Sequence, residues 1–319
     1  MKKTLIGLAL AMAATVSAFA AYPEKTVTMV VPFPPGGSTD AIARVLAQKL
    51  QEKLGGTFII DNKAGATGTI GAAFVKRAPA DGYTLFVSSL GPFVIAPHLI
   101  KGVQYDALKD LEPITVAVQA PNVLVVPAAS PYKNVAELLA GLKKTPGKVS
   151  FASSGNGSSD HLSAELFWQQ SGTEGLHIPY KGGGPAINDL LGGQVDAAFV
   201  NINSIIQHIK AGKVRALAIS SDKRSPLLPD VATLQEQGVK GAEVQSWQAV
   251  AAPKGIPADV RQKLYTAIAA SLNEKEVKDK LLAQGFEIVA NTPEQFAKFQ
   301  AAEYAKWKTL IETRKITAD

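Results

Sequence analysis

The residues best suited to bind a small anion lie in one loop near the start of the chain. The run VPFPPGGSTD, residues 31–40, leads from a strand through a proline turn and two glycines into a predicted helix. Such a helix start exposes N–H groups and a partial positive charge that bind anions, and the glycines let a ligand approach. A tight turn followed by an ordinary helix cap is the alternative. The candidate ligand-binding residues are Phe33, Gly36, Gly37, Ser38, Thr39 and Asp40.

A second loop repeats this design later in the chain. Residues 149–152 are predicted as a strand, and residues 153–160 (SSGNGSSD) lead from it into another predicted helix. One such loop is weak evidence, but two loops on facing walls would clamp an anion from both sides. The candidate residues of this second loop are Ser154, Gly157, Ser158 and His161.

Other polar residues lie where further predicted elements begin or end. Glycines in the turn 180–185 (YKGGGP) free backbone amides before a helix, and a lysine there could pair with a ligand carboxylate; a solvated surface turn is the alternative. Serine hydroxyls end the strand at residues 83–88, at the same edge as the first loop, and an asparagine follows the strand at residues 196–200. These additional candidates are Ser89, Lys181, Gly182 and Asn201.

Catalytic and metal-binding arrangements lack their usual signatures. The sequence has no Gly-x-Ser-x-Gly motif and no cysteine, and none of its four histidines pair at metal-ligand spacing. Gly155 and Gly157 lack the third glycine of a dinucleotide site, and no nucleotide-binding P-loop motif is present. His161, close to Ser158, is the one candidate general base, with a capping or core role as the alternative. We therefore predict a binding protein without catalytic residues, metal or cofactor.

The elements that position these loops follow the pattern of an α/β fold. From Thr26 onward, short β-branched runs alternate with segments of helical period, which is typical of mostly parallel sheets. The chain crosses between two such units only near Pro121 and near Trp247. We therefore expect two domains, residues 21–121 with 248–319 and residues 122–247, hinged at the crossings, with a cleft at the strand ends.

The N-terminus predicts export to the periplasm. Lys2 and Lys3 precede the apolar stretch 5–16, and the small-residue pattern Ala18-Phe19-Ala20 follows. This is the pattern of a signal peptide, residues 1–20, cleaved after Ala20. The apolar stretch is shorter than the about 20 residues that span a membrane, so we expect a soluble mature chain.

The charge and cysteine content of the chain indicate which classes of partner and which covalent links to expect. The net charge of +6 is mild, and no basic tract or basic patch interleaved with aromatic residues is present. Nucleic acid is therefore not an expected partner, while a positive field modestly favours anionic solutes. The absence of cysteine excludes disulfides and a lipid-attachment cysteine.

The chain resembles the periplasmic binding proteins of tripartite tricarboxylate transporters, also called the Bug family. The resemblance spans essentially the whole mature chain and includes the motifs VPFPPGG (31–37), ADGYTL (80–85), SGNGS (154–158), PYKGGGPA (179–186), LGGQVD (191–196) and APKGIP (252–257). It implies a two-domain flytrap fold whose first loop and serine-glycine loop hold a ligand carboxylate through amides, hydroxyls and bound water. It also implies delivery to a membrane permease of one large and one small subunit, driven by an ion gradient. Asp196, which ends the LGGQVD motif, is included among the candidate ligand-binding residues.

We predict a periplasmic solute-binding protein that captures a small carboxylate-bearing solute between two domains and works as a monomer. Two alternatives stay open: a periplasmic sensor that binds the same solute and feeds a signalling receptor, and a periplasmic hydrolase or isomerase that uses His161. Residues 62–68 and 247–249 depart from the family's common pattern, which bears on ligand identity more than on fold.

Overall fold

The computed structural model describes residues 22–318. The predicted signal peptide, residues 1–20 with its cleavage point after Ala20, lies outside these residues. Helices and strands alternate along the described chain as an α/β fold requires. None of the described helices has the length and apolar character needed to cross a membrane.

The described strands form one mixed ten-stranded sheet. They are β1 (Val27–Val31), β2 (Phe58–Asn62), β3 (Thr84–Ser89), β4 (Leu111–Pro127), β5 (Ser150–Ser153), β6 (Leu176–Pro179), β7 (Ala197–Asn201), β8 (Val214–Ile219), β9 (Gln245–Pro253) and β10 (Glu287–Ile288). The order across the sheet is β2-β1-β3-β9-β4-β7-β5-β6, and β8 and β10 also pair with β4. Strand β1 is parallel to β2 and β3, and β5 is parallel to β6 and β7, whereas β4 and β9 are antiparallel to their neighbours.

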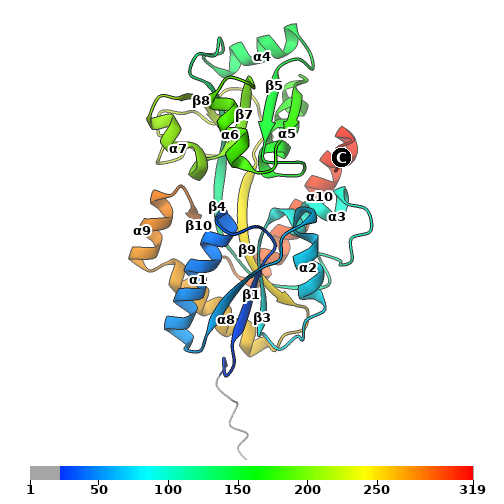
Figure 1. The fold of residues 1–319 in the computed structure, drawn as a ribbon, viewed down its shortest axis with the longest axis vertical. Helices are drawn as coiled ribbons and strands as arrows, with labels where there is room; N and C mark the ends of the chain where they lie inside the picture. The colour runs from blue at the N-terminus through cyan, green and yellow to red at the C-terminus, as the bar shows by residue number, and fades with distance from the viewer. Residues whose placement is uncertain (1–21, 319) are drawn as a thin grey trace, which may run out of the picture.

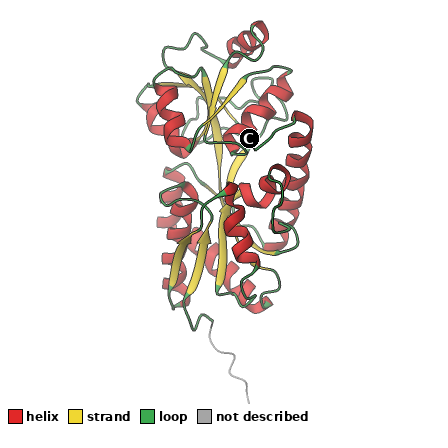
Figure 2. Cartoon of the chain, turned by 45° about the vertical axis from the view of Figure 1, so that its right-hand side comes forward, coloured by secondary structure: helices red, strands yellow, loops and turns green. Residues whose placement is uncertain are grey.

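Helices flank this sheet along its length (Figures 1 and 2). They are α1 (Ser38–Leu54), α2 (Thr69–Lys76), α3 (Ala96–Leu99), α4 (Val135–Lys144), α5 (Ser159–Ser171), α6 (Gly183–Leu191), α7 (Ile202–Lys210), α8 (Ala258–Leu272), α9 (Lys275–Ala283) and α10 (Pro293–Arg314), with short helical turns η1 (Ala66–Gly68) and η2 (Gly91–Ile95). In Figure 1, α4 to α7 surround β5, β7 and β8 at one end of the molecule, while α1, α2 and α8 surround β1 and β3 at the other. Strands β4 and β9 run between the two ends.

Strand β4 makes the sheet continuous. Residues 111–121 pair with β9, and residues 122–127 pair with β7 and β8. Pro113 and Pro121 cannot donate ladder hydrogen bonds, so local sequence argues against a strand over the first part of β4. In the structure, a register shift after Pro113 accommodates the first proline. The predicted α/β class is confirmed, but one mixed sheet stands where two mostly parallel sheets were expected.

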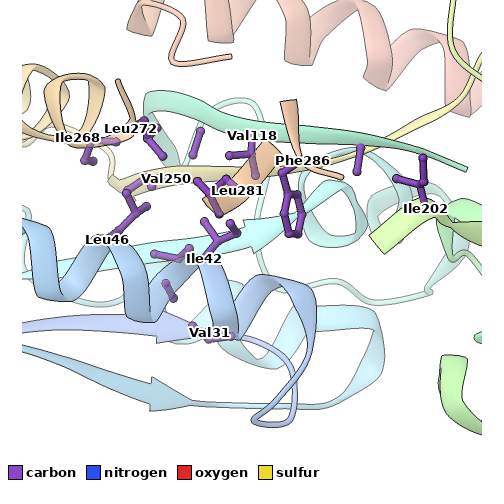
Figure 3. Packing of buried hydrophobic residues seen from close by; sticks show 14 of the residues in the cluster. Val31, Ile42, Leu46, Val118, Ile202, Val250, Ile268, Leu272, Leu281 and Phe286 are labelled. Carbon is purple, nitrogen blue, oxygen red and sulfur yellow. The ribbon is translucent and has the colours of Figure 1, made fainter. Parts of the chain in front are cut away.

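Helix α1 shows how the sequence builds the core next to the first loop. Its apolar residues recur at helical spacing, so Ile42, Leu46 and Leu50 fall on one face and are fully buried. Figure 3 shows Ile42 and Leu46 pointing into a cluster that includes Val31 of β1 and Val250 of β9. The end of β1 and the start of α1 are therefore held by one packed core.

An aromatic cluster joins α10 to the middle of the sheet. The ring of Phe93 lies 5.6 Å from those of Trp247 and Phe296, and the Phe93–Phe296 contact is edge-to-face. All three side chains are buried. Trp247, near the second predicted chain crossing, is therefore part of the buried core.

We predict that Phe296→Ala lowers the free energy of unfolding by about 3–5 kcal/mol, because it removes a fully buried ring and leaves a cavity. Phe74→Ala is the matched control: Phe74 is 39% exposed, and its truncation should cost less than about 1 kcal/mol. Denaturant unfolding of both variants measures the difference. Equal losses would contradict the packing described for α10.

Candidate functional site

The loop between β1 and α1 folds around the carboxylate of Asp40, which is 2% exposed. Its Oδ2 accepts the N–H of Gly36 at 3.0 Å and Nε of Arg44 at 2.8 Å. Its Oδ1 accepts Nη2 of Arg44 at 3.2 Å and Nδ2 of Asn62 at 3.1 Å. The same Asn62 amide donates to the carbonyl of Phe33 at 3.0 Å. This buried carboxylate and its partners therefore hold the loop in shape.

The charge of Asp40 is maintained by its hydrogen bonds. Burial alone would raise the pKa of this carboxyl, but the bonds from Arg44, from the Gly36 N–H and from Asn62 outweigh burial, so its pKa lies below its ordinary value. The group is ionised at neutral pH, and its oxygens are engaged by the protein. Asp40 is thus suited to support the loop rather than to contact an anion.

In the part of the chain that the structure describes, the first turn of α1 has three unpaired backbone donors. Gly37 caps the helix in an extended conformation, and within residues 22–318 no side chain makes a capping hydrogen bond at this helix start. The N–H of Ala41 bonds to the carbonyl of Gly37 at 2.9 Å. Within the described chain, the N–H groups of Ser38, Thr39 and Asp40 have no such partner. Unpaired donors at a helix start form an anion-binding site.

The loop between β5 and α5 is built in the same way. Oδ2 of Asp160 accepts the N–H of Ser154 at 2.6 Å, and its Oδ1 accepts the Ser154 hydroxyl at 3.0 Å. Ser158 caps α5 by accepting the N–H of His161 at 3.3 Å. Among the residues that the structure covers, no partner bonds to the N–H groups of Ser159 and Asp160. In the described chain, this helix start therefore also has backbone donors without a partner.

Two stacked imidazoles lie behind the serine-glycine loop, residues 153–158. The ring centroids of His161 and His177 are 3.7 Å apart, and the rings are nearly parallel at 6°. Nδ1 of His161 accepts the N–H of Gly157 at 3.0 Å, so in the neutral ring the proton resides on Nε2. Nε2 of His177 lies 2.6 Å from Oγ of Ser153. Burial, and then the neighbouring His161, lower the pKa of His177 to about 4.

The imidazole nitrogen and the serine hydroxyl that acid–base chemistry would use already make hydrogen-bonding contacts within the protein. Nδ1 of His161 already accepts from the backbone, and Ser153, the serine paired with His177, is 1% exposed. In residues 22–318, no cluster of three or more His, Cys, Asp or Glu side chains could hold a metal ion. The arrangement can bind through backbone donors and hydroxyls.

The start of α1 contacts α7, and the serine-glycine loop contacts η2 and α3. Nδ2 of Asn203, at the start of α7, donates to Oγ of Ser38 at 3.2 Å. Gly157 has a φ of +74°, and a Cβ atom there would lie 2.7 Å from Leu99 Cδ2 and 3.1 Å from Ile95 Cγ2. The serine-glycine loop thus packs against η2 and α3, and the positive φ of Gly157 favours glycine at this position.

Several further candidates lie beside these loops. The N–H of Gly182 donates to the carbonyl of Ser154 at 3.1 Å, which places the turn 180–185 against the serine-glycine loop. Nδ2 of Asn201 donates to Asn122 at 3.1 Å, and its Oδ1 is buried without a partner in the described chain. Lys181 is exposed.

Phe33 and Ser89 belong to the β1–β3 side. Ser89 is half-buried at the end of β3, which is parallel to β1, so the two strands end at the same edge. Cζ of Phe33 would lie 3.8 Å from a Cβ atom at Gly91, the first residue of η2. These residues therefore lie around the first loop as predicted from the strand ends.

Asp196, by contrast, lies away from the two loops. Its Oδ2 accepts the N–H and the hydroxyl of Ser150 at 2.8 and 2.7 Å. Ser150 begins β5, whereas Ser153 ends it at the loop, and β5 is parallel to β7. Asp196, which precedes β7, therefore lies at the opposite end of these strands and is not part of the site we propose.

Two residues that shape the first loop, Arg44 and Asn62, are not among the candidates predicted from the sequence. Arg44 follows Asp40 by four positions on a helix, and this spacing is a recognisable signal for an ion pair. Asn62 has no local signal, because only the pairing of β2 with β1 brings it opposite Val31.

We expect Asp40→Ala to lower the free energy of unfolding by about 2 kcal/mol, because the donors around the carboxylate lose their acceptor. Asp279→Ala removes another aspartate from an i,i+4 ion pair, the exposed one with Lys275, and should cost less than about 1 kcal/mol. Thermal unfolding of both variants provides the measurement. A similar loss in the two would show that Asp40 does not organise the loop.

His177 should make the fold sensitive to mild acid. Its folded pKa of about 4 lies below its unfolded value, so between these values the unfolded chain binds more protons and stability falls as pH falls. The effect amounts to at most about 3 kcal/mol between roughly pH 6.5 and pH 4. His177→Gln should flatten this part of the stability-versus-pH curve, measured by denaturant unfolding at several pH values. A curve as steep as that of the wild type would refute the assignment.

The chain is similar to known proteins over nearly its full length. Residues 42–316 match TctC, the tripartite tricarboxylate transporter family receptor. The chain is 40% identical to BugT of Bordetella pertussis, over 96% of this chain and 95% of BugT.

Solved structures agree with this match. A protein of R. palustris solved with adipate is 36% identical, with a TM-score of 0.85 over 93% of this chain and 99% of that chain. MatC from Rhodopseudomonas palustris, solved with bound malate, is 31% identical, with a TM-score of 0.81 over 91% of this chain and 100% of that chain. The chain therefore belongs to the TctC family, the periplasmic solute-binding receptors of tripartite tricarboxylate transporters.

Proposed function

We propose that the protein binds a small organic carboxylate between two domains and delivers it to a gradient-driven permease of one large and one small subunit. The observation that carries this proposal is the pair of helix starts at α1 and α5, each with unpaired N–H groups. Donors converging from two sides suit an ionised carboxylate, which only accepts hydrogen bonds. Family membership makes the chain a binding protein and not an enzyme.

The proposed domains are residues 21–121 with 248–319 and residues 122–247. Strand β4 changes partners at this boundary, because Pro121 pairs with Gln245 of β9 and Asn122 pairs with Asn201 of β7. The two crossing segments would act as a hinge, and ligand would favour the closed form because only that form contacts both loops. This is the flytrap arrangement expected from the sequence.

The proposed ligand class draws on the relatives. One relative was solved with adipate and another with malate, and both compounds carry carboxylates. The proposed contacts are Phe33, Gly37, Ser38, Thr39, Ser89, Lys181 and Asn201. The other candidates already bond within the protein and would support the loops: Gly36, Asp40, Ser154, Gly157, Ser158, His161 and Gly182. We further propose export by the signal peptide at residues 1–20, action as a monomer, and no role for nucleic acid.

The proposal is tested on the mature chain from Ala21, freed of ligand by unfolding and refolding. Adipate, malate and other carboxylates should raise its melting temperature, whereas neutral sugars should not. Ligand at 100 times its dissociation constant adds about 2.7 kcal/mol. Mass spectrometry should recover the bound compound unchanged. Stabilisation by neutral solutes alone would overturn the carboxylate assignment.

Gly37→Val should weaken carboxylate binding about tenfold or more, because a branched side chain would stand in front of the α1 donors. The fold should survive, since Gly37 has a φ of −79° and a Cβ atom there would find only the Pro34 carbonyl, at 4.0 Å. Ala301→Val, on an exposed position of α10, is the control and should bind like the wild type. Isothermal titration gives the affinities. Unchanged binding by Gly37→Val would place the ligand elsewhere.

A further inference from the structure

Helix α10 connects the two ends of the molecule outside strands β4 and β9. Its first half packs through Phe296 against the aromatic cluster at η2. Near its end, Leu310 and Ile311 share a buried cluster with Leu162 and Leu166 of α5. Figures 1 and 2 show α10 extending from the β1–β3 end toward α5. The C-terminal helix therefore contacts the helix that begins at the serine-glycine loop.

An ion pair fixes this contact. Nε of Arg314, the last residue of α10, lies 2.8 Å from Oε2 of Glu165, and their side chains are 20% and 12% exposed. Nη2 of Arg314 lies 3.4 Å from Glu174. Beyond the helix, the carbonyl of Ala318 accepts Nδ2 of Asn156, in the serine-glycine loop, at 3.0 Å.

From Glu165 the contacts continue to the loop backbone. Its Oε1 faces Nε2 of His161 at 3.7 Å, which is an electrostatic contact rather than a hydrogen bond. Burial would raise the pKa of Glu165, but His161 and Arg314 outweigh it and the pKa lies below its ordinary value. A charged Glu165 favours the His161 tautomer with the proton on Nε2, and that tautomer leaves Nδ1 to accept the Gly157 N–H.

We infer that Arg314 is a positioning residue for the ligand-binding loop: it holds Glu165, which orients His161, which fixes the Gly157 amide. The inference rests on the proposed carboxylate-binding function, and Arg314 itself touches no ligand in this scheme. Removing one partner of a largely buried ion pair leaves the other charge uncompensated. Loss of Arg314 should therefore disturb Glu165, and through Glu165 the orientation of His161.

The test uses the full mature chain and the carboxylate that most stabilises the wild type. Arg314→Met and Glu165→Gln should each weaken binding on the order of tenfold, and the double variant no more than either single change, because all interrupt one series of contacts. Arg314→Lys should recover most of the affinity. Arg224→Met, which breaks an exposed ion pair with Glu236, is the matched control and should leave binding unchanged.

A spectroscopic readout separates positioning from a general loss of stability. The imidazole ¹⁵N shifts of His161 should report an Nε2–H ring in the wild type and a mixture of tautomers in Arg314→Met, with the conservative Arg314→Lys close to the wild type. Wild-type affinity and an unchanged His161 spectrum in Arg314→Met would overturn the inference. If the wild type bound no carboxylate, the proposed function would fail, while the His161 spectra would still decide whether Arg314 positions this ring.

Discussion

Two aspartates hold the loops of the proposed site, each in the first turn of a helix with its side chain bonded back to the loop before that helix. Asp40 accepts the Gly36 N–H, and Asp160 accepts the Ser154 N–H. In both cases the carboxylate fixes the loop while the N–H groups of the first helical turn stay unpaired in the described chain. A negative side chain near a helix start is itself favourable, so each aspartate also stabilises the helix it belongs to.

This constraint explains why the proposed recognition falls on backbone groups. Two carboxylates near the loops are already paired, Asp40 with Arg44 and Glu165 with Arg314. Backbone N–H groups at a helix start bond to the carboxylate itself and make few contacts with the rest of the ligand. A scaffold of this kind fits a family in which one relative was solved with adipate and another with malate. Discrimination would then fall to the residues around the anion, such as Phe33 and Asn201.

The loops were predictable from sequence because glycines, serines and strand ends are local signals. The alternation of strands and helices likewise predicted the α/β class. The full length of strand β4 could not be predicted from local sequence, because Pro113 and Pro121 argue against a strand there, while pairing with β9 and a register shift tolerate them. The LGGQVD motif does not show at which end of the strands Asp196 lies. The direction of the strands puts this residue beside Ser150, away from the two loops. Contacts between distant segments, such as Asn62 with Phe33, leave no local trace.

A crystal structure of the mature chain with the carboxylate that stabilises it most would test the central claim most directly. We expect carboxylate oxygens within hydrogen-bonding distance, directly or through one water, of the Ser38 or Thr39 N–H groups and of the start of α5. A ligand bound away from both helix starts, or held only by side-chain cations such as Lys181, would contradict it.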